Sequence, residues 1–175
     1  YVYVKPSCVA NARADMVLCY GVNQKLNGSG GSVYHWSPSN NLSNPDIANP
    51  VFHTQTPGTF IYTLDVSDNN GCNASKKDTV VITVLPQAKI FAGNDTSIVM
   101  NQPFQLNVVD LTNSGFVNYS WSPLFGLNNS SIKNPTATLS SDTRYVFTAK
   151  TKEGCEAKDE ISIKVFTQAD FYVPT

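Results

Sequence analysis

The sequence predicts an all-β protein made of two tandem β-sandwich domains. Three observations support this prediction. The chain repeats itself at a period of roughly eighty residues, short alternating runs recur between turns, and no stretch keeps helical spacing for three turns. A chain of 175 residues that is 41% hydrophobic can bury the cores of two such domains.

The repeat is defined by anchors that keep their order in both halves. Trp-Ser-Pro at residues 36–38 returns at 121–123, an offset of 85, whereas earlier anchors match at an offset of 80. We place the five extra residues of the second copy around Asp110–Phe116, a polar loop where insertion costs little. The predicted domains are repeat 1 (residues 6–86) and repeat 2 (87–167). Residues 1–5 are expected to form the last strand of a preceding repeat, and 168–175 the start of a following C-terminal domain.

Strands are expected where apolar and polar residues alternate. These runs are residues 33–36, 59–66 and 79–84 in the first copy and 119–121, 143–149 and 161–165 in the second. Residues 68–71 and 151–154 predict tight turns, because Asn and Gly tolerate positive φ. Copies of this size with about seven short strands fit an immunoglobulin-like sandwich.

Four aromatic residues occupy matching positions in the two copies. Trp36 and Trp121 are the only tryptophans of the chain. A surface tryptophan could stack on a sugar, but one per domain in the same strand is typical of a sandwich core. The same reasoning makes Tyr62 and Tyr145 core residues.

The four cysteines are Cys8, Cys19, Cys72 and Cys155, too widely spaced for a metal site. We interpret Cys19 and Cys72 as a disulfide within the first copy, which indicates an oxidising compartment. Cys8–Cys72 is the alternative pairing, and the spacing does not choose between them. Val99 stands where the second copy would need its first cysteine, so Cys155 is expected to be unpaired.

Several classes of function are unsupported by the sequence. The formal net charge is −1 and no Lys/Arg cluster occurs, which argues against nucleic-acid or membrane-surface binding. No apolar run is long enough for membrane insertion. His35 and His53 have no counterparts in the second copy and no phosphate loop or paired-carboxylate site is visible, so we predict no enzyme activity and no cofactor. Asp65 and Asp68 fit an ordinary polar turn better than a calcium site, a question the sequence leaves open.

Residues 18–21, 36–50 and 62–72 resemble the PKD-like, immunoglobulin-like repeats found in very large secreted proteins of Bacteroidetes. The second copy matches at Trp-Ser-Pro, Asn-Pro and Gly-Cys but departs at Val99 and Asn101, where that family usually has Cys and Gly. Residues 169–175 are similar to the opening of the gliding-motility-associated C-terminal domain. This resemblance implies export by the type IX secretion machinery and display on the extracellular face of the outer membrane.

The leading functional hypothesis is a structural spacer in the stalk of a secreted surface adhesin, whose partners are the neighbouring repeats and the type IX machinery. The alternatives are a module that binds surface glycans or proteins and an ancillary domain of a secreted hydrolase. Such a module would use the loop around Asp110–Phe116 or the polar stretch Ser39–Asn49.

Overall fold

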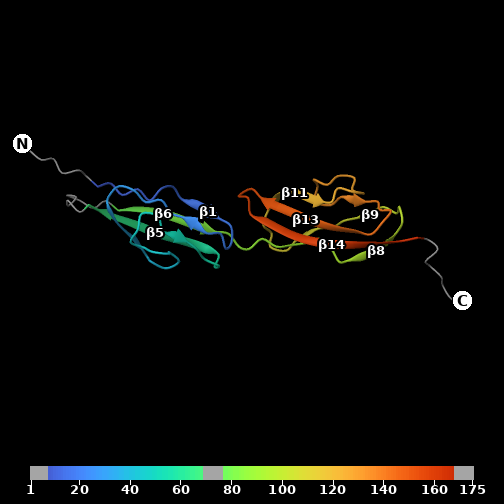
Figure 1. Cartoon of the computed structure of the whole chain (residues 1–175), viewed down its shortest axis with the longest axis horizontal. Coiled ribbons are helices and arrows are strands. Elements are labelled where there is room, and N and C mark those ends of the chain that lie inside the picture. Colours follow the sequence, from blue (N-terminus) through green and yellow to red (C-terminus); the bar gives the residue numbers. More distant parts are fainter. Residues whose placement is uncertain (1–7, 69–76, 168–175) are drawn as a thin grey trace, which may run out of the picture. The chain divides into compact units, whose positions relative to one another are not determined.

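Residues 8–68 and 77–167 are described by the computed structural model, and all their regular elements are β-strands (Figure 1). These two ranges contain no helix with the length and hydrophobicity that a membrane crossing requires. The chain divides into two compact units, Tyr1–Gln87 and Ala88–Thr175, so the boundary lies one residue beyond the predicted joint. The strand expected at residues 1–5 and the domain start expected at 168–175 fall outside the described residues.

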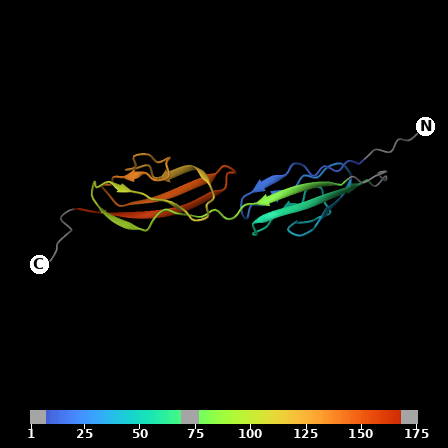
Figure 2. The ribbon, with the colours of Figure 1, turned by 180° about the vertical axis from the view of Figure 1, so that it is seen from behind.

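The first unit is built from six described strands. They are β1 (Met16–Leu18), β2 (Gln24–Lys25), β3 (Val33–Ser37), β4 (Val51–Phe52), β5 (Gly58–Ser67) and β6 (Asp78–Val84). The larger sheet has the order β1-β6-β5-β3, and the smaller one pairs β2 with β4. Strand β5 is antiparallel to both of its neighbours, whereas β1 runs parallel to β6. Figure 2 shows the teal and green strands β5 and β6 from behind.

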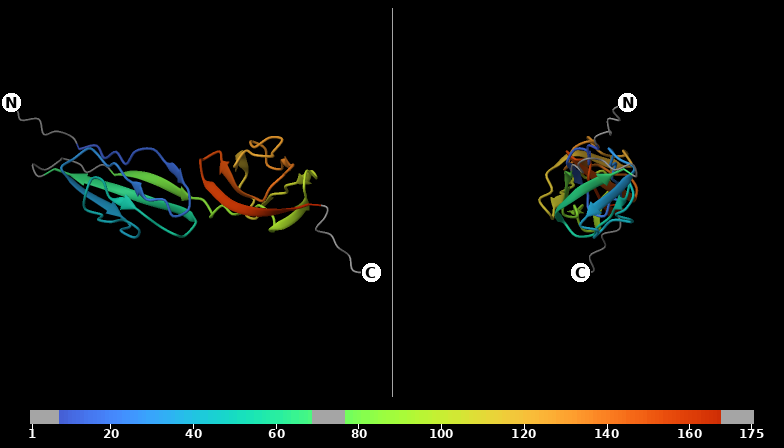
Figure 3. Two further views of the ribbon diagram at one scale, coloured as in Figure 1. Left: turned by 45° about the vertical axis from the view of Figure 1, so that its right-hand side comes forward. Right: turned by 90° about the vertical axis from the view of Figure 1, so that its left-hand side faces the viewer.

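The second unit repeats this plan and adds one short pair of strands. They are β7 (Ile90–Phe91), β8 (Thr96–Val99), β9 (Phe104–Gln105), β10 (Val109–Asp110), β11 (Phe116–Ser122), β12 (Thr136–Ala137), β13 (Thr143–Thr151) and β14 (Glu156–Phe166). The four-stranded sheet has the order β11-β13-β14-β8, and the short pairs are β12-β9 and β10-β7. The long orange-to-red hairpin of β13 and β14 can be followed in Figure 3.

Each unit has its own hydrophobic core. The most deeply buried large side chains of the first are Trp36, Phe52, Tyr62, Leu64 and Ile82, and those of the second are Leu106, Trp121, Leu139, Tyr145 and Phe147. Burial alternates along the central strands, as a sandwich requires, because successive side chains point to opposite faces of a sheet. This architecture confirms the predicted fold class of tandem immunoglobulin-like sandwiches.

All six expected strand runs lie within observed strands, but two features were missed. Strand β14 begins at Glu156, five residues before the expected run. The first five residues of β14 are polar except for Ala157, so they show little alternation of apolar and polar residues. They nevertheless pair with β13. Two-residue strands such as β9 and β12 carry no periodicity, so only tertiary pairing defines them.

The position where the second copy departs from the repeat family keeps the same backbone shape. Gly21 has φ 70° and its counterpart Asn101 has φ 61°, both left-handed. Asn visits this region more readily than other residues with a Cβ, so it can replace Gly here. The substitution therefore leaves the turn after the first strand of the larger sheet in place.

Candidate functional site

Trp36 and Trp121 lie in the centres of their units, with exposed fractions of 0% and 1%. Each occupies the edge strand of the larger sheet, where Trp36 is paired across the sheet with Leu64 and Trp121 with Phe147. A tryptophan with no exposed face cannot stack on a sugar. Both residues are therefore core residues and not a binding platform.

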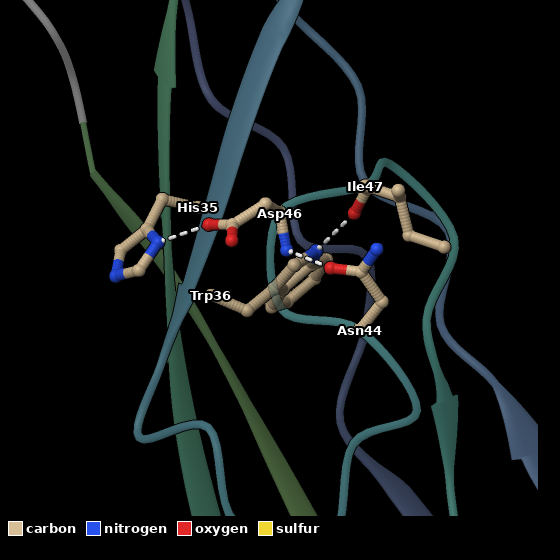
Figure 4. A network of polar contacts seen from close by, with 5 residues as sticks. All are labelled: His35, Trp36, Asn44, Asp46 and Ile47. Atoms are coloured by element: carbon tan, nitrogen blue, oxygen red, sulfur yellow. Dashed lines mark hydrogen bonds and ion pairs between the residues drawn. The ribbon is translucent and has the colours of Figure 1, made fainter.

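Both indoles also hold the loop that follows their own strand. The indole N–H of Trp36 donates to the carbonyl of Ile47 at 3.1 Å, and that of Trp121 donates to Ile132 at 3.1 Å. Figure 4 shows this bond in the first unit, beside the Asn44 side chain that accepts the N–H of Asp46. The polar stretch Ser39–Asn49 is thus tied to the core at its end, although most of its side chains are exposed.

Tyr62 and Tyr145 hold the other side of the same loops. The hydroxyl of Tyr62 donates to the carbonyl of Asn40 at 2.6 Å, and the hydroxyl of Tyr145 donates to the carbonyl of Phe125. Burial raises the pKa of Tyr62, which a hydrogen bond with Asn41 partly offsets. Burial alone raises the pKa of Tyr145 to about 12. The four predicted core aromatics thus combine burial with loop anchoring.

Ionisation of Tyr145 is expected to destabilise the second unit at alkaline pH. Its pKa is about 12 in the folded unit against an ordinary value of 10.0. The contribution of the neutral phenol is therefore complete below pH 10.0 and is lost as the pH rises from there through about 12. Urea unfolding across this range should show a steeper loss of stability in the wild type than in Tyr145→Phe. Equal pH dependence of the two proteins would contradict this assignment.

His35 forms an exposed pair with a carboxylate. Its Nδ1 lies 2.6 Å from Oδ1 of Asp46, and both side chains are more than half exposed (Figure 4). The pair has no equivalent in the second unit, where Ser120 and Ser131 stand at these positions. Among the described residues, the polar partner recorded for the His35 ring is this carboxylate.

Asp65 and Asp68, which the sequence suggested as calcium ligands, interact with other side chains. Asp65 lies 3.4 Å from the ammonium of Lys77, and Asp68 accepts a hydrogen bond from the Ser32 hydroxyl at 3.1 Å. In residues 8–68 and 77–167, no three His, Cys, Asp or Glu side chains gather as metal ligands would. The polar turn at residues 69–71 lies outside the described residues.

Cys8, Cys19 and Cys155 are each disulfide-bonded. The prediction that Cys155 is unpaired is therefore wrong. This prediction assumed that each copy forms the same internal disulfide, and Val99 stands in the second copy where the first has Cys19. A disulfide partner, however, need not lie at the matching position of the same copy. Cys72 lies outside the described residues, so the Cys19–Cys72 pairing and its Cys8–Cys72 alternative stay predictions.

Both units pair the first and last strands of their larger sheet in parallel. In the first unit β1 pairs in parallel with β6 from Met16↔Ile82 to Leu18↔Val84. In the second, β8 pairs in parallel with β14 from Thr96↔Ile163 to Val99↔Phe166. Sequence patterns could not reveal this pairing, because the alternation of apolar and polar residues along a strand does not say in which direction its neighbour runs.

Carboxylates fasten the same region in both units. Oδ1 of Asp15 accepts the N–H of Val81, and Oδ1 of Asp95 accepts the N–H of Ser162, each at 2.8 Å. In the opposite direction, Asp78 accepts the N–H of Ala12 and Asp159 that of Ala92, again at 2.8 Å. The aspartates at matching positions thus hold the entering segment to the last strand.

No protein-family model and no curated protein matches the chain. Among solved structures, it is similar to the C-terminal 282-residue fragment of intimin, solved in complex with the intimin-binding domain of its translocated receptor. The identity is 15% and the TM-score 0.53 over 74% of this chain and 50% of that one. For the insect immune protein hemolin, the identity is 16% and the TM-score 0.46, over 93% of this chain and 48% of that one. For the fibronectin(III)-like modules of CbhA from Clostridium thermocellum, the identity is 8% and the TM-score 0.43, over 95% of this chain and 98% of that one. At this identity the likeness to the intimin fragment shows the fold alone.

Proposed function

We propose that this chain is a pair of spacer modules in the stalk of a large secreted surface adhesin. The observation that carries the proposal is the parallel pairing of the first and last strands of the larger sheet in each unit. Parallel strands point the same way, so the chain enters this pair at one end and leaves it at the other. A pulling force on the two ends of a unit therefore loads the pair in shear.

Shear loading suits a stalk because the hydrogen bonds between the two strands share the load. The pair is extended in each unit by one more bond, Leu85 N–H to the Leu18 carbonyl at 2.9 Å and Met100 N–H to the Phe166 carbonyl at 2.8 Å. The aspartates described above brace the same strands. The second unit has four residue pairs against three in the first, so it should be the more resistant of the two.

Export and partners belong to the same proposal. The resemblance to type IX-secreted repeat proteins supports delivery to the extracellular face of the outer membrane, and bonded cysteines fit an oxidising location. The partners are then the neighbouring repeats and, through a following domain, the type IX machinery. The intimin fragment with this fold is seen bound to a receptor domain. We place the binding of a protein receptor at a separate tip of the adhesin, which the stalk carries.

Replacing Met100 by proline is expected to weaken the second unit against force. Proline removes the N–H that bonds to the Phe166 carbonyl, a loss of about 1 kcal/mol at the end of the sheared pair. Single-molecule pulling from the two termini, with the disulfides reduced, should show two unfolding peaks. Met100→Pro should lower the force of the higher peak, which we assign to the second unit.

Met100→Ala is the matched control, because it removes the same exposed side chain but keeps the N–H. Its peak should match that of the wild type. If proline and alanine lower the force equally, or if neither unit resists force, the mechanical role is wrong. Protease accessibility of the full-length protein on intact cells tests the surface location separately.

A further inference from the structure

The inserted loop of the second unit borders a hollow of about 240 Å³. Its floor is made by the buried side chains of Val108 and Phe147, and the half-buried rings of Phe116 and Tyr119 form its wall. The ring of Tyr119 is stacked on that of Phe147, with 6.1 Å between centroids. The hollow is smaller than the roughly 300–1,000 Å³ of pockets for drug-sized ligands, so its capacity is one small ring.

The matching place in the first unit leaves no room for a side chain at residue 28. Gly28 stands where the second unit has Val108, and a Cβ at Gly28 would lie 2.9 Å from side-chain atoms of Leu64 and Trp36. The N–H of Gly28 bonds directly to the carbonyl of Ala48 at 2.8 Å. In the second unit the N–H of Val108 bonds to Oδ1 of Asn134 instead, at 2.9 Å. A side chain of one loop thus takes the place of a backbone carbonyl as the acceptor between the two loops.

The inserted loop is held in shape without any ligand. Oδ1 of Asp110 accepts the N–H of Thr112 at 3.1 Å, and Oδ2 accepts that of Ser114 at 2.8 Å. The hydroxyl of Thr112 accepts the N–H of Lys89 at 3.0 Å, which ties the loop to the neighbouring segment. A loop braced in this way loses little conformational freedom when it binds.

Two polar groups at the hollow have no recorded partner in the part of the chain that the structure describes. The exposed amide of Asn113 and the half-buried ammonium of Lys133 both line it, and neither forms a hydrogen bond or ion pair among the described residues. Ala48 stands at the position of Lys133 in the first unit, so the cation is specific to this copy. The carboxylate of Asp110 balances the charge of Lys133, and so the lining favours an uncharged ligand.

We propose that this hollow binds one neutral pyranose residue of a surface polysaccharide. A sugar ring presents C–H groups on its faces and hydroxyls at its rim. The apolar floor and the aromatic wall suit the C–H faces. The rim hydroxyls can accept from Lys133, donate to the remaining lone pairs of Asp110 and do either with Asn113. The site would let one stalk module hold the glycan layer, and it does not depend on the mechanical role.

The test is an NMR titration of the whole chain with the methyl glycosides of glucose, galactose and N-acetylglucosamine, with glucuronic acid as a charged comparison. A neutral glycoside should shift the amides of residues 110–119 and 133, with a Kd on the order of 1 mM for a single ring. Lys133→Ala should weaken this binding roughly tenfold by removing a charged hydrogen-bond donor. The first unit already carries alanine at this position, and an unchanged spectrum elsewhere would show that the variant folds.

Lys152→Ala is the matched control, since it removes another lysine of the same unit that does not line the hollow. It should bind as the wild type does. The proposal is overturned if no neutral glycoside shifts these amides at tens of millimolar. It is also overturned if Lys133→Ala binds as tightly as Lys152→Ala, or if glucuronic acid binds better than every neutral sugar. A failure here would leave the pulling experiment untouched.

Discussion

Trp121→Ala is expected to unfold the second unit and leave the first one folded. The indole is 1% exposed and contacts the ring of Phe147 at a centroid distance of 4.7 Å and that of Tyr145 at 6.1 Å. Truncating a buried Trp costs about 3–5 kcal/mol, and here the carbonyl of Ile132 also loses its donor. That cost approaches the whole stability of a domain with about eighty residues.

The distribution of tryptophans makes this result easy to read. Each unit holds one, so the fluorescence of Trp36 reports on the first unit alone in the Trp121→Ala protein. Chemical denaturation should show an unchanged Trp36 transition, while circular dichroism loses the transition of the second unit. Trp36→Ala is the mirror experiment, and Trp121→Phe should cost less because it leaves a smaller cavity. Loss of the Trp36 transition in Trp121→Ala would show that the units do not fold independently.

Asp159→Ala is expected to destabilise the second unit by about 2–3 kcal/mol. The Asp159 carboxylate accepts the N–H of Ala92 at 2.8 Å, and Ala92 is 0% exposed. Without the carboxylate, a buried N–H loses its acceptor and pays the desolvation penalty of an unmade hydrogen bond. Asp159→Asn keeps an oxygen acceptor of the same shape and should recover much of the loss.

The neighbouring residue supplies the control for this change. Glu160 forms an ion pair with Arg144 on the surface, and both side chains are at least half exposed. Exposed pairs contribute little, so Glu160→Ala should cost below about 1 kcal/mol. Thermal unfolding gives the two costs, and hydrogen exchange should show the Ala92 amide losing protection only in Asp159→Ala. Equal costs for the two alanine variants would refute the role assigned to Asp159.

The sequence alone determined the features that depend on local pattern and on repetition. Alternating residues gave the six main strands, and the matching of Trp36 with Trp121 and of Tyr62 with Tyr145 placed the core, because a domain of this size buries its largest side chains. The offset change from 80 to 85 located the insertion near Asp110–Phe116. These inferences are possible because the alternation of apolar and polar residues in a strand is a property of consecutive residues.

The tertiary structure alone decided the features that join distant residues. Nothing local distinguishes Asp159, which caps a buried amide, from Glu160, which lies in a surface ion pair. The direction of β8 against β14 depends on the path of the whole chain, and so does the bonding of Cys155. Beside the hollow, matching amides meet different acceptors, the Ala48 carbonyl in the first unit and the Asn134 side chain in the second. Such contacts span 20 to 70 residues, so no pattern within a single strand can encode them.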